Sequence, residues 1–104
     1  MILSTTDTIP GKQVNRVLGI AKGNTIRARH IGKDILALFK TIVGGEIEEY
    51  TKLIAEAREQ ALDRMIANAR ELGADAVINV RFSTSYIMGT ASEILAYGTA
   101  VKLG

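Results

Sequence analysis

The chain has 104 residues, 47% of them hydrophobic, and 13 basic against 11 acidic side chains give a formal net charge of +2. This length fits one domain, and so small a charge does not indicate nucleic-acid binding without a concentrated basic patch. Because cysteine is absent, disulfides, thiolate metal ligands and cysteine nucleophiles are excluded. No apolar run approaches the roughly 20 residues that span a bilayer, and residues 1–4 lack a secretory signal pattern, so we expect a cytoplasmic protein without membrane contact.

The first third of the chain is typical of β-structure. Residues 1–6 predict a short strand, and Pro10-Gly11 favours a tight turn after it. Residues 13–30 are strand-like, with glycines at positions 19 and 23 where a bulge or a close backbone approach is the ordinary explanation. Two interpretations stay open here, one long bent strand or a hairpin hinged at residues 22–24. Helical spacing of apolar residues from 31 to 43 then predicts a short helix that ends at Gly44-Gly45.

Residues 46–72 contain neither proline nor glycine and predict one long helix. At about 1.5 Å per residue it would span about 40 Å, longer than the roughly 26 Å diameter of a compact domain of this size. Its apolar stripe comprises Ile47, Tyr50, Ile54, Ala57, Ala61, Met65 and Leu72. A second apolar flank, formed by Ala55, Leu62, Ile66 and Ala69, indicates a contact beyond one sheet.

Two further strands are predicted from alternating polarity, at residues 76–88 and 94–103, with a turn at 89–92. In residues 76–88 we expect Asn79, Arg81, Ser83 and Ser85 on one face. The resulting fold class is α+β, a two-layer β-α-β-β subunit with a mostly antiparallel sheet, one long helix and a short helix before it. Since one helix covers one sheet face, we expect the other face and the helix flank to meet further copies of the chain.

Several segments together resemble the YbjQ-like family of small bacterial and archaeal proteins over essentially the whole chain. They are Gly44-Gly45-Glu46 with Tyr50, Ala57-Arg58 with Ala61, residues 73–77, residues 80–82 and residues 96–101. The resemblance implies one domain over residues 1–104, a dodecin-like subunit, a ring-shaped homopentamer and heavy-metal binding. Heavy metals prefer thiolate and imidazole ligands, but the chain offers no cysteine and one histidine.

His30 is therefore the candidate metal ligand, shared between copies of the chain, although a lone histidine more often packs or caps. The carboxylates of Glu46, Glu48 and Glu49 would suit a hard cation. Their alternative role is to oppose the positive end of the long helix. The sequence identifies no cofactor beyond this candidate metal ion.

Three polar residues are candidates for anion binding or for a subunit junction. Arg58 borders the apolar stripe, where it either forms a structural ion pair or binds an anion at a junction. Asn79 and Arg81 belong to a strand face that is either solvated or turned inward in an oligomer. Lys22, Arg27 and Arg29 form a modest basic patch without the interleaved aromatic residues of single-strand binders, so nucleic-acid binding is not expected.

No phosphate-binding glycine motif and no nucleophile elbow occurs, so we do not expect an enzyme. The first hypothesis is a homo-oligomeric, pentameric binding protein with a metal site at subunit junctions. The second is a binder of a small molecule, cofactor or anion between sheet faces, as dodecin-like assemblies can bind flavin, with only Tyr50, Tyr86 and Tyr97 to stack on a ring. The third is a structural oligomer without a ligand.

Overall fold

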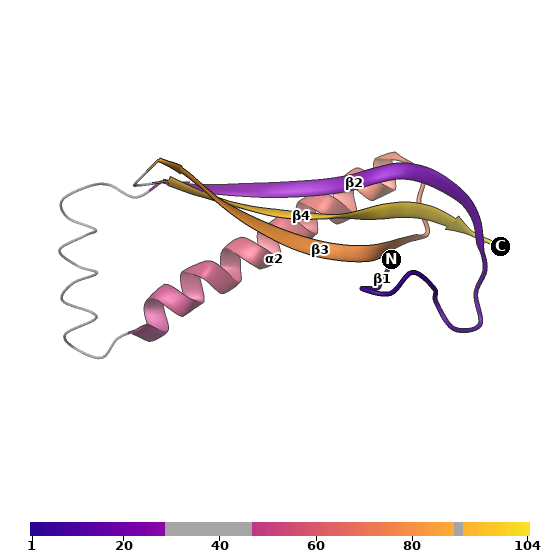
Figure 1. Cartoon of the computed structure of the whole chain (residues 1–104), viewed down its shortest axis with the longest axis horizontal. Coiled ribbons are helices and arrows are strands. Elements are labelled where there is room, and N and C mark those ends of the chain that lie inside the picture. The colour runs from indigo at the N-terminus through magenta and orange to yellow at the C-terminus, as the bar shows by residue number, and fades with distance from the viewer. Residues whose placement is uncertain (29–46, 89–90) are drawn as a thin grey trace.

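The computed structural model describes residues 1–28, 47–88 and 91–104 (Figure 1). Its elements in chain order are strand β1 (Ile2–Leu3), strand β2 (Val14–Ala28), helix α2 (Ile47–Glu71), strand β3 (Ala76–Met88) and strand β4 (Ala91–Leu103). The predicted long helix and last two strands are confirmed, although β4 begins within the predicted turn. Strand β2 is continuous, so the hairpin interpretation is wrong. The predicted short helix between residues 31 and 43 lies outside the described residues.

The strands form one mixed sheet in the order β1-β3-β4-β2. Strand β1 runs parallel to β3, whereas β4 pairs antiparallel with both β3 and β2. Helix α2 packs mainly on β2, less on β4 and hardly on β3. The fold is therefore a small α+β arrangement in which one helix covers one side of the sheet unevenly.

Small residues bring α2 and β2 into close contact. Ala57, Ala61 and Met65 are buried on the helix, and Ala21 and Gly23 are buried opposite them. A Cβ atom at Gly23 would overlap the main chain of Ala61 and Met65, so only glycine fits at the closest approach. One turn earlier on the helix, the buried Thr25 hydroxyl donates a hydrogen bond of 3.0 Å to the carbonyl oxygen of Ala57.

Helix α2 ends in a Schellman motif at Gly73, which has a φ of 82°. The Gly73 N–H donates to the Arg70 carbonyl and the Ala74 N–H donates to the Ala69 carbonyl, both at 3.0 Å. These bonds satisfy carbonyls that the helix leaves without an intrahelical donor. The chain then enters β3 within three residues.

A bulge in β3 corrects the predicted alternation of its side chains. Ile78 pairs with Thr99 and Arg81 pairs with Tyr97, so Asn79 and Val80 together face the single residue between them on β4. Asn79 has a φ of 53°, a left-handed conformation that asparagine tolerates better than most residues. After the bulge, Val80 and Phe82 lie on the helix side, not on the face of Ala76 and Ile78 as the simple alternation predicts.

The molecule is elongated, with extents of 53 × 23 × 16 Å. The second half of α2 lies against the sheet along β2. The first half of the helix diverges from the strands (Figure 1). Within the described residues, no helix has the length and apolar character needed to cross a membrane.

Candidate functional site

The sheet face turned away from α2, here called the outer face, carries a mixed set of apolar and polar side chains. Paired residues of antiparallel strands share a face, which places each residue. Lys22, Tyr97 and Arg81 form one row across β2, β4 and β3, and Asn24, Leu95 and Ser83 form the next. Arg81, Ser83 and Ser85 therefore do share one exposed face, as the sequence predicts.

Three aliphatic side chains on the outer face of β2 are unusually exposed, and we call them the β2 patch. They are Val17 at 63%, Ile20 at 70% and Ile26 at 56% of full exposure. Tyr97 of the neighbouring β4, at 37%, extends this apolar area toward the middle of the sheet. Lys22 and Asn24 lie between Ile20 and Ile26 on the same face, so polar side chains interrupt the β2 patch and it is not one continuous apolar surface.

A second exposed apolar surface lies on the helix side of the sheet, and we call it the helix-side surface. Phe82 of β3 pairs with the buried Ala96, which places its ring on the helix side, yet it is 46% exposed. The reason is that α2 packs mainly on β2 and β4 and makes few contacts with β3, where Val77 and Val80 are buried but Phe82 is not. Ile54 of α2, one turn before Ala57 on the sheet-facing stripe, is 36% exposed.

Asn79 and Arg81 come together at the N-terminal segment and not at a ligand cavity. The Asn79 and Val80 N–H groups donate to the carbonyls of Thr6 and Ser4, both at 3.0 Å. Nη1 of Arg81 donates to the carbonyls of Thr5 and Val80, both at 2.9 Å. Both predicted residues thus anchor residues 4–6 along β3, and Nε and Nη2 of Arg81 have no hydrogen-bond partner among the residues that the structure describes.

Two other predicted residues are not joined to this group. Arg58 lies exposed on α2, and within the described part of the chain no ion pair or hydrogen bond involves it. The expected structural ion pair of Arg58 is therefore not seen among those residues. His30 and Glu46 lie outside the described residues, and the side chains of Glu48 and Glu49 are likewise not described.

The free edge of β2 is covered by side chains of the helix. Oδ1 of Asn68 accepts a hydrogen bond of 2.9 Å from the Lys22 N–H. Nη1 of Arg64, one turn earlier, donates a bond of 2.5 Å to the Asn24 carbonyl. These bonds explain why Asn68 interrupts the apolar stripe, because the polar side chain satisfies main-chain groups at a sheet edge.

Beside this edge is an open depression of about 470 Å³ lined by Lys22, Asn24, Asn68, Glu93 and Leu95. Nδ2 of Asn24 donates a 3.0 Å hydrogen bond to Oε2 of Glu93. The carboxylate and both amides of the depression thus already have partners within the protein. The depression is therefore polar but offers few unpaired groups to a ligand.

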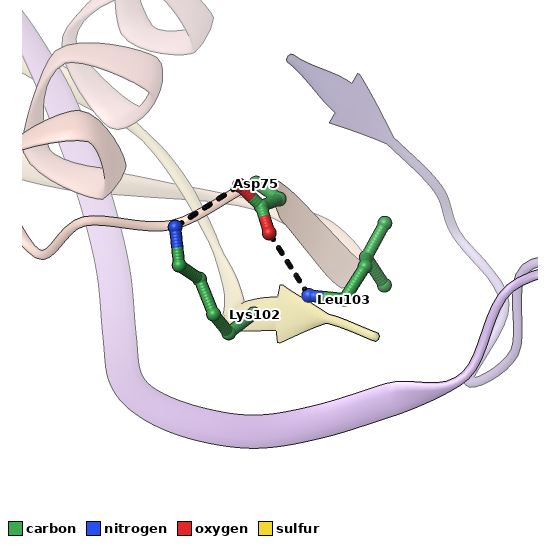
Figure 2. A network of polar contacts seen from close by, with 3 residues as sticks. All are labelled: Asp75, Lys102 and Leu103. Carbon is green, nitrogen blue, oxygen red and sulfur yellow. Dashed lines mark hydrogen bonds and ion pairs between the residues drawn. The ribbon is translucent and has the colours of Figure 1, made fainter.

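Asp75 is the best-anchored carboxylate among the described residues (Figure 2). Its Oδ2 accepts a 3.0 Å bond from the Leu103 N–H, and its Oδ1 lies 3.2 Å from Nζ of Lys102. The Leu103 bond first and Lys102 second hold the pKa of Asp75 below its ordinary value of 3.8. These contacts tie the start of β3 to the end of β4, which is a structural role.

The residues described do not fit a soft-metal site within one chain. Across residues 1–28, 47–88 and 91–104, no group of three or more histidine, cysteine, aspartate or glutamate side chains comes together. The whole chain has no cysteine and one histidine, whereas heavy metals of this kind prefer thiolate and imidazole. The one histidine, His30, lies outside the described residues, so those residues could offer a metal only oxygen ligands.

The sequence analysis missed the β2 patch. Its signal is present, because residues 21, 23 and 25 are all small or short while Ile20 and Ile26 occupy the opposite face of the same strand. Small residues on one face indicate close contact with a helix. The larger apolar residues are then left pointing away from it.

The chain is similar to known proteins over essentially its whole length. The family model of YbjQ proteins, described as "Putative heavy-metal-binding", matches residues 1–104. A "UPF0145 protein" from Methanosarcina acetivorans is 57% identical over 103 residues, covering 99% of this chain and 97% of the relative. Another, from Archaeoglobus fulgidus, is 60% identical over 103 residues, covering 99% and 95%. A Pediococcus pentosaceus protein of the DUF74 family, of unknown function, has a crystal structure with a TM-score of 0.67 at 14% identity, covering 100% of this chain and 98% of that one, which supports the fold alone.

Proposed function

Because the chain belongs to the YbjQ family, we propose that it is the subunit of a closed homo-oligomeric binding protein, a pentamer, and not an enzyme. The observation that carries this proposal is the pair of exposed apolar surfaces on opposite sides of the sheet, the β2 patch and the helix-side surface. The dodecin-like ring of five copies rests on the family resemblance. The cytoplasm remains the expected compartment, from the composition.

The family description makes a metal ion the first ligand to test. The donor set favours no soft-metal site inside one subunit, so the proposed site lies at a junction, where copies of His30 or carboxylates from different chains would meet. In this proposal the subunit folds without a bound metal ion. Assembly should therefore survive removal of metal.

An anion or a small anionic molecule is the second candidate ligand. Its support is the row Lys22, Tyr97 and Arg81, where two cations flank an aromatic ring on the outer face. Arginine recognises oxyanions through several donors at once, and part of the Arg81 guanidinium has no partner within the described part of the chain. A structural oligomer without a ligand is the outcome if neither candidate binds.

Native mass spectrometry and light scattering at micromolar concentration test the assembly. We expect a mass of five times 11.2 kDa. A monomer would refute the proposal. An oligomer with another number of subunits would refute only the pentamer. Elemental analysis of protein purified without chelator, with calorimetric titration of Zn²⁺, tests the metal. If the protein contains no bound metal and the titration releases no heat, the metal candidate is rejected.

Titration with inorganic phosphate tests the anion candidate. We expect Lys22→Ala to weaken binding without loss of assembly. Arg58→Ala is the matched cation control, because Arg58 lies on α2 and away from the row. Loss of binding in Arg58→Ala alone would instead assign the anion to the helix.

A further inference from the structure

We propose that the outer face binds an oxyanion attached to a planar aromatic ring, with the ring stacked on Tyr97 and the oxyanion bound by Arg81. This inference rests on the anion binding proposed above and deepens it by naming the ligand class, an aryl phosphate or aryl carboxylate. Strand β4 lies between β3 and β2 (Figure 1), which places Tyr97 between Arg81 and Lys22 in one row.

Arg81 presents an oriented guanidinium with one unused edge. Its Nη1 donates to the carbonyl oxygens of Thr5 and Val80, both at 2.9 Å, and these two bonds fix the plane of the group. Among the described residues, Nε and Nη2 have no partner. A guanidinium edge with two free N–H groups binds an oxyanion through two parallel hydrogen bonds. Because the protein already orients the group, little further side-chain entropy is lost on binding.

The rows next to Tyr97 on the outer face contain no acidic side chain. One row consists of Ile20, Thr99 and Ile78, and the other consists of Asn24, Leu95 and Ser83. Asp7 of the N-terminal segment forms no ion pair with Arg81. Glu93 lies one row further along β4, and its Oε2 already accepts a 3.0 Å bond from Nδ2 of Asn24. Two cations without an opposing acid in these rows favour an anion.

The depression beside the β2 edge helps to decide which cation binds the oxyanion. Lys22 lines it together with Glu93, whereas Arg81 does not. A carboxylate in the same depression repels an oxyanion, so Arg81 is the better binding group. On the Lys22 side of the ring, the depression has room for neutral substituents of the ligand. Lys22 then contributes through its charge, from across the ring.

Tyr97 and Leu95 form a short apolar strip along β4. Tyr97 is 37% exposed and Leu95 is half-buried. Polar side chains border the strip on both neighbouring strands: Lys22 and Asn24 on β2, Arg81 and Ser83 on β3. Two residues of a strand span about 7 Å, which is room for one ring. An apolar floor with a few polar groups at its border is typical of small-molecule sites, and a tyrosine ring adds stacking that a saturated ligand cannot use.

Three phosphates separate the role of the charge from that of the ring. Inorganic phosphate carries the oxyanion alone, cyclohexyl phosphate adds a saturated ring, and phenyl phosphate adds an aromatic ring with the same number of carbons. Each is titrated into the assembled wild-type protein by calorimetry in the same buffer. We expect phenyl phosphate to bind at least about threefold more tightly than cyclohexyl phosphate, because stacking adds to the burial of apolar area.

Two pairs of variants locate the ring and the oxyanion. Tyr97→Leu should abolish the preference for phenyl over cyclohexyl phosphate, whereas Tyr50→Leu, on α2 at the other side of the sheet, should keep it. Arg81→Lys retains the charge but loses the paired donors, so it should weaken the binding of all three phosphates at least about fivefold. Arg58→Lys, the same change on α2, should leave the three affinities unchanged.

NMR of the wild-type protein with labelled tyrosine rings does not depend on how well the variants fold. The chain has three tyrosines, and Tyr97→Phe assigns one set of signals. We expect phenyl phosphate to shift the Tyr97 ring signals at least about threefold more than cyclohexyl phosphate does, because a stacked aromatic ring adds its ring current. Larger shifts at another tyrosine would overturn the inference.

The calorimetric outcomes separate this inference from the proposed anion binding. Equal affinities for phenyl and cyclohexyl phosphate, or a preference that survives Tyr97→Leu, would overturn the inference. Binding of inorganic phosphate in the same titrations would still support the anion candidate. If none of the three phosphates binds, the anion candidate and this inference are rejected together.

Discussion

Replacing Gly23 by alanine tests the closest contact between the helix and the sheet. The added Cβ would lie 2.6 Å from the carbonyl carbon of Arg64 and still closer to main-chain atoms of Ala61 and Met65. Ordinary van der Waals contact needs about 3.5 Å or more, so α2 would have to move outward by about 1 Å. Main-chain atoms cannot turn aside as a flexible side chain can. The cost therefore falls on the whole packing of α2 against β2.

The magnitude follows from two opposing effects. Overpacking of this kind costs about 1–3 kcal/mol, and the severe overlap places Gly23→Ala at the upper end. Alanine also stabilises by about 0.4–1 kcal/mol, because it restricts the unfolded chain more than glycine does. We expect a net loss of about 2 kcal/mol in the free energy of unfolding, or about 8–16 °C in Tm for a domain of this size.

Urea unfolding followed by far-UV circular dichroism measures this loss. Wild type and variant are compared at one protein concentration, because assembly adds concentration-dependent stability. Ser83→Ala, on the exposed outer face, is the control and should stay within about 0.5 kcal/mol of wild type. A loss below about 0.5 kcal/mol for Gly23→Ala would refute the close approach of helix and strand described above.

Three further predictions concern single hydrogen-bonded groups. Asn68→Ala removes the acceptor for the Lys22 N–H and should lower the free energy of unfolding in urea by about 1 kcal/mol, whereas Asn68→Asp keeps the acceptor and should lose less; equal losses would contradict the edge contact. Gly73→Ala forces a φ of 82° on alanine and should cost about 1 kcal/mol by the same assay; Gly73→Asn should cost less, and no difference between them would count against the left-handed cap. The lowered pKa of Asp75 stabilises the fold above the carboxyl's unfolded value of 3.8, and this stabilisation is lost as the pH falls through the folded pKa; Asp75→Asn should flatten the acid side of the stability profile, and an unchanged slope would contradict the contact with Leu103.

The helix and the strands of the second half were predictable because their signals are local. Residues 47–71 lack helix breakers and carry a continuous stripe, and Gly73 marks the end. The two faces of β4 follow from strict alternation, which the structure confirms with Ile94 and Ala96 buried on the helix side. The glycine at position 23 was predicted to mark a bulge or a close approach, and it marks the latter.

The features that escaped prediction depend on contacts between distant segments. The bulge at Asn79 is one extra residue within an otherwise regular pattern, and its effect appears only when β3 is paired with β4. The partner of Asn68 is 46 residues earlier in the chain. The uneven coverage of the sheet by α2, which leaves Phe82 exposed, depends on the direction of the helix, which periodicity does not specify.

The bulge in β3 has a consequence for the leading residues of the chain. In a regular strand successive N–H groups point to opposite margins, but those of Asn79 and Val80 both reach residues 4–6. Deleting Asn79 would remove the bulge, so β3 would keep its register with β4 and every later side chain would stay on its present face. Residues 4–6 would lose one of the two main-chain hydrogen bonds that the bulge donates to them. The released margin of β3 would then be open to strand exchange with another molecule.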